Sequence, residues 1–155
     1  MSILNSEDLD RQLVRAQETI NRLEKDFSKS FSDGYAPVLL VDPQREIDLL
    51  KVAKENGALY IDLSRPIDYL TLCRIVQDAD SIIFDNIDRI PDSEDKEDIQ
   101  YLVKYALRKE DEVPTPFNTT LSFSDYKIGA RSRQNPGYLS EGSKACPHIL
   151  IVPQE

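Results

Sequence analysis

The chain has 155 residues, 40% of them apolar, which suits a single domain built around one sizeable core. Its 28 acidic residues outnumber 19 basic ones, and the net charge of −9 disfavours general binding to nucleic acid or to anionic membranes. The two cysteines and the one histidine cannot supply a Cys/His zinc site or a disulfide framework, which predicts a reducing, cytoplasmic environment. No apolar run approaches the length of about 18 residues that a membrane helix needs.

The first predicted element is an N-terminal helix over residues 6–28. Its apolar residues follow one another at intervals of four and three, which is the spacing of a seam along one helix face. They are Leu9, Leu13, Ala16, Ile20, Leu23 and Phe27. The seam either packs on the same chain or docks a partner through its leucines and Ile20. We therefore divide the chain into an N-terminal helix and linker, 1–33, and a main domain, 34–155.

Between residues 37 and 108, three short apolar runs that predict strands alternate with three segments that predict helices. The strands are expected at 37–41, 58–63 and 81–85, and the helices at 44–56, 67–78 and 93–108. Continuous apolar strands of this kind are typical of a parallel sheet that helices cover on both faces. The sequence therefore predicts an α/β fold.

The last third of the chain has a different composition. Alternating apolar residues in 118–128 predict a small β-hairpin, and the segment near 129–147, rich in glycine, serine, proline and basic residues, predicts a long mobile loop. The apolar run 148–152 then predicts a fourth strand. In the loop, Arg131 and Arg133 are candidate partner-binding residues, because basic side chains interleaved with tyrosines suit contact with nucleic acid or with an acidic protein.

Four segments together carry a resemblance to a known family. They are the strand and loop 38–43, the strand 58–64, the strand and loop 82–90 and the closing strand 148–152. In order and spacing they resemble the nucleotide-binding subdomain of AAA+ ATPases, whose corresponding parts are the Walker A strand and loop, a second strand, the Walker B strand and the sensor strand. The resemblance implies a mainly parallel sheet of about four strands in the order 2-3-4-1, with helices on both faces.

The resemblance places a nucleotide site at the strand ends, but the residues there depart from the family. The candidate residues of this degenerate site are Asp42, Pro43, Arg45, Asp48, Asp85 and Asn86. The loop after the first strand lacks the glycines, the lysine and the hydroxyl residue that hold phosphate and magnesium, and its carboxylates would repel a nucleotide. Asn86 stands where the family has the glutamate that polarises water, and an amide cannot act as a base. We therefore expect no ATP hydrolysis and no cofactor.

The family pattern also contains parts that no segment of this sequence matches. A fifth strand normally lies beside the first, and a helical lid follows it. With the run 148–152 assigned to the sensor strand, the sensor position falls near Glu155 and both later parts are missing. The first strand is therefore predicted to form an exposed sheet edge, with which a partner can pair.

These features predict a non-catalytic P-loop/AAA+-like domain that acts through protein–protein association, as an accessory or regulatory subunit of an intact ATPase or with a second copy of itself. Two alternatives stay open. In the first, Asp85 is a magnesium ligand, with Asp42 and Asp88 nearby, or the phospho-acceptor of a receiver-like switch. In the second, the basic loop makes the chain an accessory protein that contacts nucleic acid.

Overall fold

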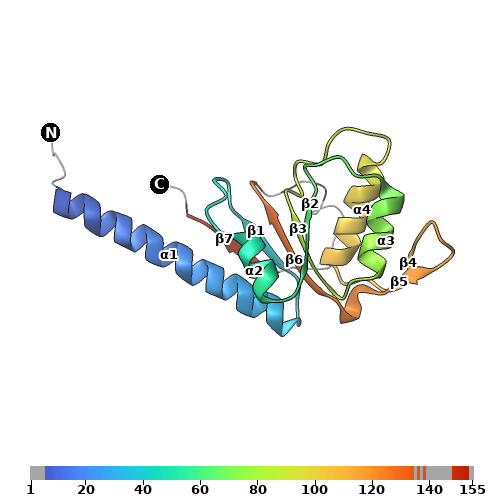
Figure 1. Cartoon of the computed structure of the whole chain (residues 1–155), viewed down its shortest axis with the longest axis horizontal. Helices are drawn as coiled ribbons and strands as arrows, with labels where there is room; N and C mark the ends of the chain where they lie inside the picture. The colour runs from blue at the N-terminus through green and yellow to red at the C-terminus, as the bar shows by residue number, and fades with distance from the viewer. Residues whose placement is uncertain (1–5, 135, 137, 139–147, 154–155) are drawn as a thin grey trace.

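The computed structural model describes residues 6–134, 136, 138 and 148–153. Within them, five strands form one parallel sheet that lies between two layers of helices (Figure 1). The strands are β1 (Val38–Val41), β2 (Leu59–Asp62), β3 (Ser81–Asp85), β6 (Lys127–Ser132) and β7 (His148–Ile151). Their order across the sheet is β2-β3-β6-β1-β7, which confirms the predicted α/β class with a mainly parallel sheet.

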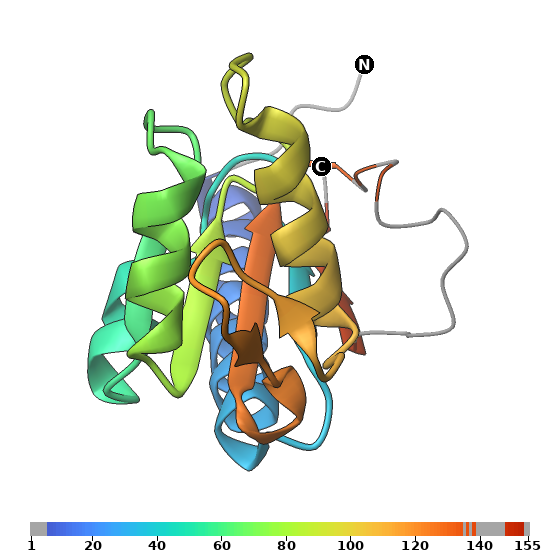
Figure 2. The same ribbon diagram turned by 90° about the vertical axis from the view of Figure 1, so that its right-hand side faces the viewer.

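Helices of the described residues cover both faces of this sheet. One face carries α1 (Ser6–Asp33) and α2 (Leu49–Glu55), and the other carries α3 (Tyr69–Gln77) and α4 (Lys96–Leu107), as Figures 1 and 2 show. Each layer encloses its own apolar core, the first around Phe27 and Leu40 and the second around Leu72 and Phe84. In the part of the chain that the structure describes, no helix combines the length and apolar character needed to cross a membrane.

The identity of the fourth strand differs from the prediction. β6 lies between β3 and β1, the place that the prediction gave to the run 148–152. That run instead contains β7, which pairs with β1 and covers the edge that was predicted to be exposed. The sequence of β6 misleads because its glycine, arginine and serine are typical of loops, although five of its six residues are buried.

The predicted hairpin and loop shift accordingly. β4 (Val113–Pro114) and β5 (Thr120–Leu121) form a short antiparallel pair, and a 3₁₀ helix, η1 (Phe123–Asp125), leads into β6. A hairpin is therefore present, but it begins earlier than residue 118. Of the predicted loop, the first four residues belong to β6, and residues 135, 137 and 139–147 lie outside the described part of the chain.

Helix α1 divides into two halves with different surroundings. Leu23 and Phe27 are buried against the sheet, whereas Leu9 and Leu13 are 47% and 68% exposed. The first half of the helix projects beyond the rest of the protein (Figure 1). Of the seam residues predicted to bind a partner, Leu23 therefore belongs to the core and Ile20 packs at its margin, while Leu9 and Leu13 remain accessible.

A glycine in β6 lets α1 approach the sheet closely. A Cβ atom at Gly129 would lie 2.8 Å from Cζ of Phe27 and 3.1 Å from Cδ2 of Phe31. The two phenylalanine rings stack on each other, with their centroids 6.3 Å apart. Gly129 thus serves helix–sheet packing inside a central strand, a position at which glycine otherwise weakens a sheet.

Candidate functional site

Three charged side chains meet at the carboxyl ends of the central strands. Asp42 follows β1, Asp85 ends β3, and Arg131 lies near the end of β6; the two carboxylates are fully buried and the arginine is 4% exposed. The guanidinium lies between the carboxylates. Its Nη1 is 3.2 Å from Asp42 Oδ2, and its Nε and Nη2 donate to the two oxygens of Asp85 at 2.9 and 2.7 Å. This bidentate contact is the geometry that makes arginine–carboxylate pairs strong.

The loop after β1 is closed by its own aspartate. The carboxylate of Asp42 accepts the backbone N–H groups of Glu46 and Ile47 at 2.9 and 3.0 Å. Further along, Asp48 caps α2 by accepting the backbone N–H of Lys51 at 3.1 Å. Backbone N–H groups at this position are the ones that a phosphate-binding loop offers to its ligand. In this chain the two nearest ones are already bonded to a carboxylate.

A second arginine reaches the site from the same loop. Arg45 Nη2 lies 3.0 Å from Asp85 Oδ2, and its Nη1 donates to the side-chain oxygen of Asn86 at 2.5 Å. Asn86 in turn donates to Asp62 Oδ1 at 2.7 Å. Arg45 and Asn86 both have a positive φ, near 53° and 58°, a conformation that is uncommon for arginine and more usual for asparagine. These left-handed turns aim the two side chains at each other.

Tyr60 of β2 completes the cluster by donating its hydroxyl to Asp85 Oδ2. We call the cluster the strand-end network. Its members are Asp42, Arg45, Tyr60, Asp62, Asp85, Asn86 and Arg131. The network connects the ends of β1, β2, β3 and β6. It contains two positively charged arginines and three negatively charged carboxylates.

Burial and pairing shift the titration of this network. Burial opposes ionisation of Asp85, but hydrogen bonds from Arg131 and Tyr60 and the charges of the two arginines outweigh it, so the pKa of Asp85 lies below its ordinary value. For Tyr60, burial and the hydrogen bond to Asp85 raise the pKa to about 12. Asp62 is also partly buried, yet hydrogen bonds from Asn86 and Ser64 lower its pKa. The carboxylates of Asp62 and Asp85 are therefore ionised at neutral pH.

The shifted pKa of Asp85 makes stability depend on pH in a defined direction. A carboxyl whose pKa is lowered by folding stabilises the native state above its unfolded pKa of about 3.9, and this contribution is lost as the pH falls through the folded value. We expect the free energy of unfolding, measured by urea denaturation, to decrease below about pH 4, with a shallower decrease in Asp85→Asn. Equal slopes in the two proteins would contradict the assignment.

The structure brings together four of the six predicted site residues, namely Asp42, Arg45, Asp85 and Asn86. Asp48 lies at the start of α2, and Pro43 lines a neighbouring hollow with Asp88 and Arg133. Arg131, which was predicted to lie in a mobile loop and to bind a partner, instead belongs to β6, and its guanidinium is buried between two carboxylates.

Three members of the network, Tyr60, Asp62 and Arg131, were not among the residues predicted for the degenerate site. Tyr60 looks like an ordinary aromatic residue of a strand, and the sequence contains nothing that shows its hydroxyl to point at Asp85. The pairing of Arg131 with this site could have been inferred from the carboxylates at the other strand ends, because a buried carboxylate normally has a basic partner. Arg133, the other arginine predicted to bind a partner, lies outside the network. It is half-buried, and its backbone N–H donates to Asp88 Oδ2 at 3.1 Å.

The ligand-binding capacity of Asp85 is largely used within the protein. Oδ1 accepts from Arg131 Nε and from the backbone N–H of Asn86, and Oδ2 accepts from Arg131, Arg45 and Tyr60. Among the described residues, no group of three His, Cys, Asp or Glu side chains is arranged to hold a metal ion. A magnesium ion or a phosphoryl group at Asp85 would have to displace at least one guanidinium.

Comparisons with known proteins do not place the chain in a family. No family model matches it, and no curated protein and no solved structure does so either. A proposal for its function therefore rests on the strand-end network and on the surfaces around it.

Proposed function

We propose that this chain is a non-catalytic P-loop/AAA+-like domain that acts in the cytoplasm through protein–protein association, as an accessory or regulatory subunit. The observation that carries the proposal is the position of the Arg131 guanidinium, which fills the space between Asp42 and Asp85 at the strand ends. In open α/β sheets this edge is where ligands bind. Here the chain occupies it with its own ion pairs.

The arrangement of the strands supports the relationship to AAA+ subdomains. In the order β2-β3-β6-β1-β7, the fourth strand of the main sheet lies between the third and the first, as the sequence resemblance implies. β7 stands beside β1, where that family has its fifth strand. If β6 is the counterpart of the sensor strand in the proposed relationship, the sensor position would lie at the end of β6, next to Arg131, and not near Glu155.

Two features of the site argue against nucleotide chemistry. The loop after β1 holds the carboxylate of Asp42 against the N–H groups of Glu46 and Ile47, so a phosphate would meet a negative charge in place of free donors. Asn86 follows Asp85 and uses its amide to join Arg45 to Asp62, a role in which it neither accepts nor releases a proton. What the fold retains is the sheet with its two layers of helices, and an exposed surface on the first half of α1.

Isothermal titration calorimetry with ATP and magnesium tests the absence of a nucleotide site. We expect no binding heat and no phosphate release above that of a buffer blank, and a P-loop ATPase measured in parallel confirms that the assay works. Micromolar binding or measurable turnover would overturn the non-catalytic part of the proposal.

Light scattering coupled to gel filtration tests association with a second copy, and cross-linking to a purified candidate ATPase tests a heteromeric partner. We expect one of these two complexes, with cross-links on the exposed half of α1 or on the loops at the carboxyl edge of the sheet. A strictly monomeric chain that forms neither complex would overturn the association part.

A further inference from the structure

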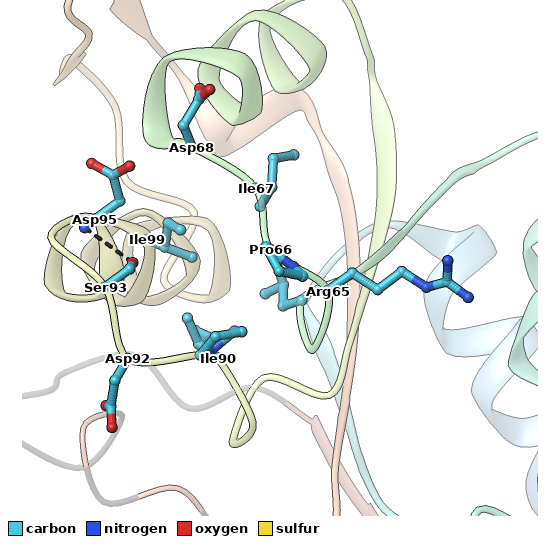
Figure 3. Close-up of a pocket in the computed structure, with 11 residues that line it drawn as sticks. Arg65, Pro66, Ile67, Asp68, Ile90, Asp92, Ser93, Asp95 and Ile99 are labelled. Atoms are coloured by element: carbon cyan, nitrogen blue, oxygen red, sulfur yellow. Dashed lines mark hydrogen bonds between the residues drawn. The ribbon is translucent and has the colours of Figure 1, made fainter.

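A pocket lies at the carboxyl edge of the sheet, to one side of the strand-end network. It has a volume of about 330 Å³ and separates the loop that follows β2 from the loop that follows β3. Its wall is mostly apolar and consists of Leu63, Pro66, Ile67, Ile90, Pro91 and Ile99. In Figure 3, Ile67, Ile90 and Ile99 surround the central hollow. Leu63 and Ile99 belong to the buried core, so the wall is fixed by the fold.

The mouth of this pocket is acidic. Asp68, Asp92 and Asp95 stand around it, and their carboxylates point outward from the apolar wall (Figure 3). Arg65 also borders the pocket, but its side chain extends away from the hollow and pairs with Asp62 at 3.7 Å. The adjoining segment 92–98 contains five acidic residues and one lysine. Negative charge thus surrounds an apolar opening.

Two of the three carboxylates at the mouth already have a hydrogen-bond or ion-pair partner among the residues that the structure describes, and the third does not. Asp68 accepts the backbone N–H of Thr71 at 2.7 Å, and Asp92 pairs with Lys96 at 2.8 Å. Both interactions keep the carboxyl groups ionised. The carboxylate of Asp95 makes no hydrogen bond or ion pair with another described residue, and Asn or Asp suits its position at the start of α4 equally well. Asp95 is therefore available to a cationic group.

We propose that this pocket docks a peptide segment of a partner protein, in which one aliphatic side chain stands between basic residues. The aliphatic side chain would enter the hollow formed by the three isoleucines, and the basic residues would face Asp92 and Asp95. This inference deepens the proposed association function and rests on it, because it names the chemistry of the partner.

Size and charge select this occupant over others. A hollow of about 330 Å³ is at the small end of ligand pockets, which suits one side chain and its neighbouring backbone. Carboxylates around the mouth repel nucleotides and nucleic acid. A second copy of this chain carries the same net charge of −9 and is a poor electrostatic match, whereas a basic segment is complementary.

Fluorescence anisotropy with a labelled synthetic peptide tests the proposal. The probe is a short peptide with one central leucine and two arginines on each side, and the full-length chain is titrated into it. We expect saturable binding that weakens at high salt. Replacing the central leucine by asparagine should weaken binding by roughly tenfold or more, the effect expected from losing one buried aliphatic side chain.

A pair of matched variants locates the binding site. Asp92→Asn with Asp95→Asn removes two charges at the mouth and is expected to weaken binding by roughly tenfold. Asp10→Asn with Glu18→Gln removes the same charge from exposed positions of α1 and should leave the affinity within about twofold of the parent. Urea denaturation of both double variants verifies that they fold.

Failure of this inference is distinguishable from failure of the proposed function. Equal binding by the two double variants, equal binding of the asparagine peptide, or no binding of the leucine peptide would overturn the docking site. If the same preparations still bind no ATP and still form a complex with a partner, the proposed function stands without this pocket.

Discussion

Replacement of Arg131 by methionine is expected to lower the free energy of unfolding by roughly 3–5 kcal/mol at neutral pH. Methionine keeps much of the side-chain length but leaves the carboxylates of Asp42 and Asp85 buried, and Arg45 then pairs with Asp85 alone. An unpaired buried charge costs far more than the ion pair contributes. Urea denaturation monitored by circular dichroism measures the effect.

The same variant has two controls. Adding Asp42→Asn and Asp85→Asn removes the unpaired charges and should restore a large part of the lost stability. The loss in Arg131→Met alone should also shrink toward pH 4, because without Arg131 burial raises the pKa of the Asp85 carboxyl and acid then favours the folded state. A loss below about 1 kcal/mol at neutral pH would show that Arg131 does not stabilise the strand-end network as its geometry indicates.

The second large effect is expected in α1. Phe27→Ala should cost roughly 3–5 kcal/mol, because Phe27 is fully buried, stacks on Phe31 and contacts the backbone of β6 near Gly129. Leu13→Ala, on the same helix and the same apolar seam, should change the free energy of unfolding by no more than about 0.5 kcal/mol, because Leu13 is 68% exposed. Thermal and urea denaturation of the two variants measure this contrast.

The contrast separates two roles within one helix. If both substitutions destabilise the protein equally, the projecting half of α1 is also packed in solution, as it would be in a stable dimer. If neither does, the helix does not rest on the sheet. The expected result leaves the second half of α1 as part of the core and the first half as accessible surface.

The layered α/β fold could be predicted because its pattern is local. The apolar runs that became β1, β2 and β3 are short and continuous, and each is followed by a segment with helical periodicity. Parallel strands bring their carboxyl ends to one edge, so the meeting of Asp42 with Asp85 and Asn86 could also be predicted. None of these steps requires knowledge of contacts between distant segments.

The fourth strand could not be predicted in this way. Residues such as Gly129 and Arg131 are typical of a solvated loop, and nothing near them in the chain indicates otherwise. Gly129 is needed because the rings of Phe27 and Phe31 press on that point of the sheet. Arg131 can be buried because Asp42 and Asp85 neutralise it.

The sequence by itself thus determined the class of the fold, the direction of the strands and the edge at which the carboxylates gather. Only the tertiary structure decided that Arg131 occupies the space between Asp42 and Asp85. It also decided that the second half of the α1 seam is buried in the core while the first half is exposed. The physical reason is common to both. A charge or an apolar side chain takes its role from what lies opposite it, and the opposing groups here come from segments far away in the chain.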